Sequence, residues 1–292
     1  MNEFNAIAAQ SSRLGKLHLP EGVGQLALLK VSGEEAVDGL FSFRVEAFSP
    51  SLDVDLDAGL GRHVTVEIET LEHGARYFDG ILTEAEWLGV REHGQCYALT
   101  LRPWFWLCGR RRNQRIFHNK TGPEIIAEVL GDHAAAGSFT DKLTKSYPVV
   151  EYTVQYRESD LEFCTRMMEV HGISYHFTHE MGAHTLVLTD GFDAYRVVPG
   201  GTRVFKPVEE YHRSGSEQFR HWAPGRRLTT GRIALVDYNF KSPSAAMDAA
   251  QDGDADHDQG RIESFDYPGG YEDQGRGKEV AQLRAEQERS RD

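Results

Sequence analysis

The segment from Tyr152 to Phe177, YTVQYRESDLEFCTRMMEVHGISYHF, constrains the fold most because it specifies three consecutive elements. Strand-forming residues lead into Ser159-Asp-Leu-Glu162, a capping box in which the serine caps a helix and the glutamate bonds back to the backbone of the serine. Apolar residues then recur at helical spacing until Gly172, which supplies a stop. Alternation from Ile173 to Phe177 returns to a strand. The sequence therefore predicts a strand–helix–strand unit within a mixed α/β region.

A second capped helix precedes this unit. Thr121-Gly-Pro-Glu124 repeats the capping-box order, and Pro123 fits the first turn because its missing N–H needs no partner there. An apolar stripe follows and Gly131 supplies the stop.

The first third of the chain has the pattern of antiparallel strands. Apolar and polar residues alternate in three runs, 41–47, 64–68 and 97–101, and turns that contain glycine separate the runs. A period of two places one set of side chains on a core face and the other set outside. Several short strands at this spacing predict an antiparallel barrel or sandwich.

The last third returns to strands and ends in a helix. Strand-like residues occupy 226–240 and 261–267. Between them, 244–259 is rich in alanine and aspartate with Met247 as its apolar anchor, so we expect a solvated loop. Residues 278–292 are polar and favour a helix.

Length and charge limit the classes of function. The 292 residues suffice for about two domains. A net charge of -13 repels nucleic acid and anionic membrane surfaces, so we expect neither as a partner. No segment approaches the ~18 consecutive apolar residues of a membrane span. The N-terminus lacks the apolar core of a secretory signal, so we expect assembly in the cytoplasm without a signal peptide.

Two groups of side chains have the composition of a metal site. The first consists of histidines 171, 176, 179 and 184, which lack a known ligand spacing and which we expect at the surface or in a hairpin. The second group mimics the spacing of a calcium loop and comprises Asp252, Asp254, Asp256, Asp258 and Glu263. His257 stands where that loop needs glycine, so we expect a solvated acidic loop, with no metal and no cofactor.

No pattern identifies a catalytic site. The chain has no G-x-S-x-G elbow, P-loop or dinucleotide fingerprint between a strand and a helix. Asp160 and Glu162 fall in a first helical turn, where the helix dipole favours negative charge, so capping explains them. The cysteines at 96, 108 and 164 form no CxxC pair, and we expect buried, reduced thiols. We therefore expect no catalytic residue and no enzyme.

The run 110–115 holds four arginines beside an aromatic stretch that includes Trp104 and Trp106. Such a patch can bind single-stranded nucleic acid. The acidic composition instead favours aromatic packing at a barrel-to-helix junction and arginines paired with carboxylates across a surface or subunit interface. We expect five structural anchors in the core or at junctions: Trp104, Trp106, Tyr156, Phe163 and Tyr267.

Seven segments resemble, in order, one known family. They are LFSFRVEAFS (40–49), RYFDGILT (76–83), YALTLRPWFWL (97–107), RIF (115–117), the motif residues within 154–173, DYNFKSP (237–243) and YPGGY (267–271). Together they resemble the N-terminal hub region of the VgrG spike-tip proteins of type VI secretion, relatives of contractile phage tail baseplate hubs. Agreement of many weak motifs in one order is what one specified structure requires.

The resemblance implies a mainly β, α+β fold with two antiparallel β-barrel domains of phage-tail-hub type and a mixed α/β middle segment. The implied domains are a first barrel (1–112), a segment with two capped helices (113–200), a second barrel (201–277) and a polar helical linker (278–292) toward a C-terminal spike that this sequence does not contain. Segments 61–87 and 225–240 share a loose strand pattern.

The implied function is structural. Three copies would form a pseudo-sixfold ring that docks on the hexameric inner tube and supports the puncturing needle and effector cargo. Partners would be further copies of the chain, the tube protein, and effectors or adaptors. The apparatus would deliver the protein outside the cell or into a target cell. Alternatives are a phage or phage-like tail hub, a cell-wall hydrolase or metal-dependent enzyme, and a monomeric adaptor.

Overall fold

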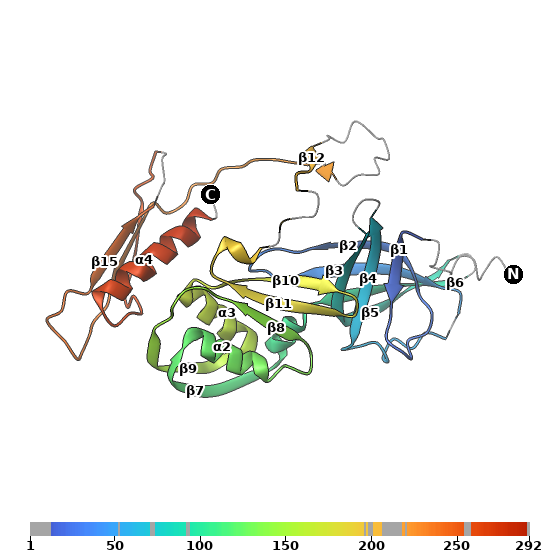
Figure 1. Cartoon of the computed structure of the whole chain (residues 1–292), viewed down its shortest axis with the longest axis horizontal. Coiled ribbons are helices and arrows are strands. Elements are labelled where there is room, and N and C mark those ends of the chain that lie inside the picture. The colour runs from blue at the N-terminus through green and yellow to red at the C-terminus, as the bar shows by residue number, and fades with distance from the viewer. Residues whose placement is uncertain are drawn as a thin grey trace. The chain divides into compact units, whose positions relative to one another are not determined.

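The computed structural model describes residues 13–290 except 52, 71–73, 92–93, 196, 198–200, 206–217, 220 and 254–257. The chain divides into two compact units near residue 204 (Figure 1). Unit 1 holds a six-stranded sheet and an α/β part, and unit 2 holds a small sheet with one helix. None of the described helices combines the length and the apolar character needed to cross a membrane.

Unit 1 begins with an antiparallel sheet in the order β1-β4-β5-β6-β3-β2. Its strands are β1 (Gly15–His18), β2 (Ala27–Glu34), β3 (Ser42–Ser49), β4 (His63–Thr70), β5 (Gly74–Arg91) and β6 (Gly94–Arg102). The three alternating runs of the first third are β3, β4 and β6, so those strand predictions are confirmed. β5 is 18 residues long and pairs with β4 through its first half and with β6 through its second half.

This sheet is curled so that its two edge strands face each other. A Cβ added to Gly15 of β1 would stand 2.8 Å from the Leu28 side chain of β2, and the Arg13 guanidinium donates to the Leu28 carbonyl at 3.1 Å. In the described residues no backbone ladder joins β1 to β2. The sheet is therefore a curled half-barrel closed by side chains.

The α/β part follows, with its helices between a two-stranded ribbon and a three-stranded sheet (Figure 1). Its elements are η2 (Trp104–Arg110), β7 (Arg112–Thr121), α2 (Gly122–Gly131), β8 (Ser138–Lys142), β9 (Val149–Ser159), α3 (Asp160–His171), β10 (Ser174–Glu180), β11 (Ala183–Thr189) and η3 (Phe192–Ala194). β7 and β9 form the antiparallel ribbon, and the sheet order is β10-β11-β8 with β8 parallel to β11.

Both predicted capping boxes are confirmed. The Thr121 hydroxyl accepts the Glu124 N–H at 3.4 Å and the Ser159 hydroxyl accepts the Glu162 N–H at 3.2 Å. Each glutamate carboxylate accepts the backbone N–H of its cap residue in return. Gly172 ends α3 with a φ of 63°, a left-handed conformation that glycine adopts without a steric cost.

One hydrophobic core continues from the curled sheet into the α/β part. Phe41, just before β3, packs edge-on against Phe177 of β10 with ring centroids 5.1 Å apart. On the other side of the helices, Phe117 of β7 stacks on Phe163 of α3 at 5.5 Å. The sheet and the helices of unit 1 therefore fold around a shared core.

Unit 2 has its own small core. Its elements are β12 (Val204–Phe205), β13 (Gln218–Phe219), β14 (Arg232–Val236), β15 (Asp248–Asp252), β16 (Glu263–Asp266) and α4 (Gln274–Arg289). β14 lies between β15 and β16, and the core of this unit comprises Ile233, Leu235, Met247, Ala249, Tyr271 and Ala281. The helix expected near the C-terminus is confirmed as α4.

The expectation of a solvated loop over 244–259 was wrong for 248–252, which form β15. Met247 and Ala249 are buried because they alternate onto the face that meets the core of unit 2. The mainly β character predicted from the sequence is confirmed, with one curled half-barrel in unit 1 and a three-stranded sheet in unit 2.

We predict that Ser159→Ala lowers the free energy of unfolding by about 1 kcal/mol, because the Glu162 N–H then loses its acceptor at the start of α3. Urea denaturation followed by circular dichroism measures this change. Glu169→Ala, an exposed substitution on the same helix, is the control and changes the free energy by less than about 0.5 kcal/mol. Equal effects of the two substitutions would contradict a capping role for Ser159.

Candidate functional site

A buried carboxylate organises the α/β part. Asp160 is the first residue of α3, and its side chain is completely buried. Its oxygens accept hydrogen bonds from Arg115 of β7 at 2.6 Å, from Gln155 of β9 at 2.8 Å and from His133, which follows α2, at 2.9 Å. The Asp160 N–H donates to the Arg111 carbonyl at 3.0 Å. One side chain thus ties the ribbon and both helices together.

The surroundings keep this carboxylate charged. Burial alone would raise the pKa of Asp160, but the hydrogen bonds from Gln155, His133 and Arg115 outweigh burial and hold that pKa below its ordinary value. Asp132, which is 40% exposed, accepts a second hydrogen bond from Arg115 at 2.7 Å. The Arg115 guanidinium therefore lies between a buried and an exposed carboxylate.

The acidic residues at the start of α3 have more than one role. Glu162 is a capping residue as expected, but Asp160 is a buried ion-pair partner, and Glu158 pairs with Arg166 at 2.6 Å. The arginines were expected to pair with carboxylates at a surface or interface. Arg111 and Arg115 do pair with the exposed Asp132, as expected. Arg115 also pairs with the buried Asp160, because the ribbon brings it across from α3.

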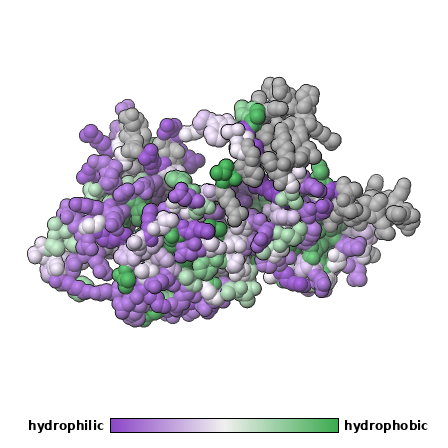
Figure 2. Space-filling model, viewed as in Figure 1, coloured by the Kyte–Doolittle hydropathy of each residue, from purple (hydrophilic) through white to green (hydrophobic). Residues whose placement is uncertain are grey.

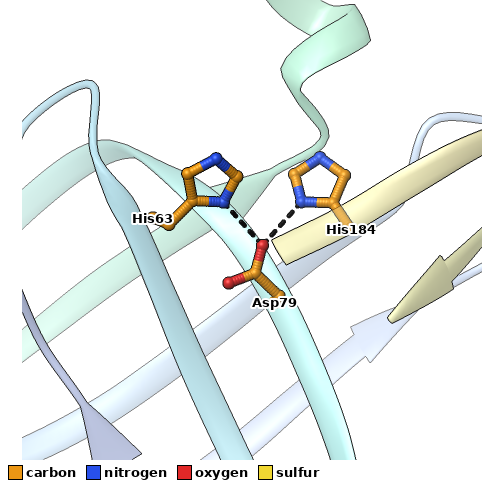
Figure 3. A group of neighbouring side chains, drawn as sticks. All are labelled: His63, Asp79 and His184. Atoms are coloured by element: carbon orange, nitrogen blue, oxygen red, sulfur yellow. Dashed lines mark hydrogen bonds and ion pairs between the residues drawn. The ribbon is translucent and has the colours of Figure 1, made fainter. Parts of the chain in front are cut away.

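A second buried polar cluster joins the curled sheet to the α/β part (Figure 3). The Asp79 carboxylate of β5 lies between His63 of β4 and His184 of β11, and its Oδ1 is 2.7 Å from the Nδ1 atom of each ring. The Thr65 hydroxyl donates to the other carboxylate oxygen at 2.7 Å. Asp79 and His184 are fully buried, whereas His63 is partly exposed.

Hydrogen bonds define the protonation of this cluster. Nε2 of His184 accepts the Trp104 N–H at 2.8 Å, so the ring proton sits on Nδ1 and points at Asp79. Burial lowers the pKa of His184, which keeps the ring neutral. The bond to Asp79 raises the pKa of His63. Burial opposes ionisation of Asp79, yet hydrogen bonds from His184, His63 and Thr65 hold its pKa below the ordinary value.

The cluster has the residue types of a metal site but not its geometry. One ligand atom from each of the three residues lies within 4.8 Å of the others. Ligands about 2.0–2.1 Å from a tetrahedral zinc stand ~3.3 Å apart. The 2.7 Å separations are those of N–H···O bonds, and both nitrogens of His184 are already occupied. We therefore assign the cluster a structural role.

His63 and Asp79 were missed in the sequence. The signal was present: Asp79 stands in the apolar strand segment RYFDGILT, and a charged residue at a buried strand position needs partners. Three of the four histidines, at 176, 179 and 184, lie in the β10–β11 hairpin, as expected. His171 of α3 is buried, and His184 is buried against Asp79 of the curled sheet. The His176 ring packs at a tilt against the Tyr195 ring, with centroids 4.9 Å apart.

Two residues of the expected acidic loop, Asp252 and Glu263, form ion pairs with an arginine. Arg232 bonds to Asp252 at 2.6 Å and to Glu263 at 2.9 Å, so these two carboxylates share one arginine. Asp258 is exposed. Asp254 and Asp256 lie outside the described residues.

The five expected anchors separate into two groups. Trp104 and Phe163 are fully buried. The Trp106 ring contacts two guanidinium groups, with the carbon of Arg110 4.1 Å and that of Arg102 5.1 Å from the ring centre. The other two anchors are not core residues: Tyr156 and Tyr267 are 60% and 62% exposed. Tyr156 is exposed because the outer face of the β7–β9 ribbon is uncovered in the single chain. All three cysteines are buried and free, as predicted.

Comparison with known sequences supports the expected family. The sequence profile of the phage tail baseplate hub (GPD) family matches residues 34–292. The type VI secretion spike protein VgrG1b of Pseudomonas aeruginosa is 33% identical over 280 residues, 95% of the chain and 37% of that protein. VgrG1c of the same organism is 34% identical over 284 residues, 97% of the chain and 39% of that protein. The chain thus spans about two fifths of the length of these relatives.

A further relative is named as a toxin. The actin cross-linking toxin VgrG1 of Vibrio cholerae is 31% identical over 200 residues, 67% of the chain and 18% of that protein. The predicted resemblance to the hub region of VgrG proteins is confirmed by these matches.

Solved structures share the fold. The alignment with the tail protein from Neisseria meningitidis covers 94% of this chain and 77% of the tail protein. Its TM-score is 0.60 and the sequence identity is 12%. A second match is the Escherichia coli c3393 protein, a component of the type VI secretion system. The alignment covers 66% of this chain and 53% of the c3393 chain, with a TM-score of 0.56 and 23% identity. At these identities the likeness is one of fold alone.

We predict that Asp160→Ala lowers the free energy of unfolding by about 3–5 kcal/mol, because Arg115, Gln155 and His133 all lose their shared buried acceptor. Asp132→Ala removes the exposed partner of the same arginine and costs less than about 1 kcal/mol. Denaturant titration of the three proteins measures both values. A loss for Asp160→Ala no larger than that for Asp132→Ala would refute the organising role of Asp160.

We predict that the stabilising effect of His63 depends on pH. Its folded pKa is raised, so its contribution is complete below the unfolded pKa of about 6.5 and is lost as pH rises through the folded value. The difference in unfolding free energy between the natural chain and His63→Gln is therefore larger at acidic than at alkaline pH. His118→Gln, which replaces an exposed histidine of β7, is the control. A His63 difference that stays constant with pH would contradict the assignment.

Proposed function

The chain belongs to the phage tail baseplate hub (GPD) family, and from this membership we propose that it is the structural hub of a type VI secretion spike tip. The observation that carries the proposal is the match of residues 34–292 to the hub family, with similarity to two spike proteins over at least 95% of the chain. The fold agrees with the proposal: a curled β sheet with an α/β part, like that of a tail protein.

The proposed mechanism is symmetric assembly. Each copy contributes two related barrels, one built on the curled sheet of unit 1 and one on the β15-β14-β16 sheet of unit 2. The proposed domains are 1–112, 113–200, 201–277 and 278–292. Three copies then present six barrels, so a threefold hub can meet a hexameric tube. Closed rings are the usual outcome when identical chains associate with rotational symmetry.

The buried clusters support a structural function over an enzymatic one. The Asp160 carboxylate is held by hydrogen-bond donors from three neighbouring residues, and both nitrogens of His184 are engaged. Neither group is free to accept a proton from a substrate. The toxin named among the relatives shares only 18% of its length with this chain, so the similarity does not extend to most of that protein.

The proposed partners are further copies of the chain, the hexameric tube protein, and effectors or adaptors. The protein is assembled in the cytoplasm, and the apparatus delivers it outside the cell or into a target cell. A phage or phage-like tail hub is the second candidate, favoured by the likeness to the Neisseria tail protein, which is one of fold alone.

We predict that the purified chain associates to three times its 32.8 kDa mass as concentration rises, since the proposed ring has threefold symmetry. Light scattering coupled to size-exclusion chromatography measures the mass. The chain should also cosediment with hexameric rings of the tube protein. A single-chain mass at every concentration, together with no cosedimentation, would contradict the proposal. Release of soluble fragments from purified cell walls would instead favour a hydrolase.

A further inference from the structure

The outer face of the β7–β9 ribbon is exposed and carries hydrophobic and aromatic side chains among polar ones such as Gln114 and His118. Its inner face packs on the helices through Phe117 and Gln155, which are buried. The opposite face exposes Ile116, Tyr152 and Tyr156, each at least 60% exposed. On the face of the molecule that Figure 2 presents, hydrophobic residues stand among hydrophilic ones. A strip of tyrosines and an isoleucine in solvent is typical of a surface that a partner covers.

An irregularity in the ribbon places charge beside this strip. The register shifts between Asn113 and Arg115, and Arg157 has a φ of 57°, a conformation that costs energy in a residue other than glycine. The shift turns Tyr156 and Arg157 outward, with the Arg157 guanidinium 5.3 Å from the centre of the Tyr156 ring. Arg112 donates to the Arg157 carbonyl at 3.4 Å. Backbone strain of this kind often marks a functional site.

Within the part of the chain that the structure describes, neither arginine forms an ion pair with a carboxylate, although the charge of Arg112 contributes to lowering the pKa of Glu162. The nearby acidic side chains are engaged elsewhere, since Glu158 pairs with Arg166 and Glu162 caps α3. Arg112 and Arg157 therefore form an exposed basic end to the strip, in a chain whose net charge is -13. We call Ile116, Tyr152, Tyr156, Arg112 and Arg157 the ribbon face. Tyrosine and arginine are the residue types enriched where protein surfaces bind.

The same unit carries a complementary surface. Asp53, Asp55 and Asp57 alternate with Val54 and Leu56, which pack against the core of unit 1. The three aspartates are consequently all exposed, and we call them the acidic row. In the described residues no lysine, arginine or histidine pairs with them.

The backbone of the acidic row is fixed in place. The Asp55 N–H donates to the Val23 carbonyl at 3.1 Å, and a Cβ at Gly24 would stand 3.0 Å from the Asp53 carbonyl. Gly24 has a φ of 94°, so this close approach depends on a residue without a side chain. A fixed row of charges binds at a lower entropic cost than a loop that must be ordered first.

We propose that the ribbon face of one copy docks on the acidic row of the next copy. The contact is head-to-tail: two different surfaces meet, and each copy uses both. Such contacts close into a ring when the rotation between neighbours divides a full turn. The proposal rests on the threefold assembly above and assigns its contacts. The tyrosines and Ile116 supply the apolar centre, while Arg112 and Arg157 pair with the aspartates and select the partner surface.

Two variants test this pairing. Arg112→Gln with Arg157→Asn neutralises the ribbon face and keeps a residue at position 157 that tolerates a positive φ. The second variant replaces Asp53, Asp55 and Asp57 with asparagine and so neutralises the acidic row. Asparagine at position 55 retains a side-chain oxygen that can accept the Ala58 N–H. Sedimentation velocity should find that association of either variant alone is weakened by about tenfold or more. An equimolar mixture should form a two-chain species, because one intact contact remains and the ring cannot close.

Arg76→Gln with Arg91→Gln is the matched control, since it removes the same charge from two exposed arginines of β5. It should associate like the natural chain. Tyr156→Ser, which leaves the charge unchanged, should weaken association as well, and thermal melting verifies that each variant folds. Variants that trimerise like the natural chain would overturn this contact and leave the threefold assembly standing. A natural chain that never associates would overturn both.

Discussion

The burial of one carboxylate, that of Asp160, is the constraint on which the α/β part of unit 1 depends. A charged group removed from water costs several kcal/mol unless hydrogen bonds and an opposite charge replace the solvent. The chain meets that requirement with Arg115, Gln155 and His133, which come from β7, β9 and the residues after α2. Because each donor stands on a different element, the carboxylate is satisfied only when ribbon and helices are assembled together.

The His63–Asp79–His184 cluster likewise satisfies a buried carboxylate with groups from separate elements, here at the junction of the curled sheet and the α/β part. Its central carboxylate stands on β5 and its buried histidine on β11, and that histidine also accepts the Trp104 N–H at the start of η2. Both polar clusters thus hold packed elements in one arrangement. A rigid unit of this kind suits a protein that acts through the surfaces it presents, and the ribbon face and the acidic row are two such surfaces.

Local rules account for what could be predicted from the sequence. Ser159 and Thr121 revealed their helices because a capping box is a contact between residues three apart. Contacts between distant residues left no comparable pattern: Asp79 and His184 are separated by 105 positions, and only the folded chain brings them together. Tyr156 was expected in the core or at a junction because alternation in a strand distinguishes two faces without telling which face is buried. Met247 and Ala249 are buried against α4 and β14, a contact that an alanine- and aspartate-rich stretch does not predict.

In the proposed function, threefold association brings this chain into register with a sixfold tube. The most direct measurement is electron cryomicroscopy of the chain bound to hexameric rings of the tube protein. The account predicts a threefold ring seated on the hexamer, with two comparable β lobes from each chain and thus six around the axis. Isolated single chains on the tube, or a ring with one β lobe for each chain, would contradict it.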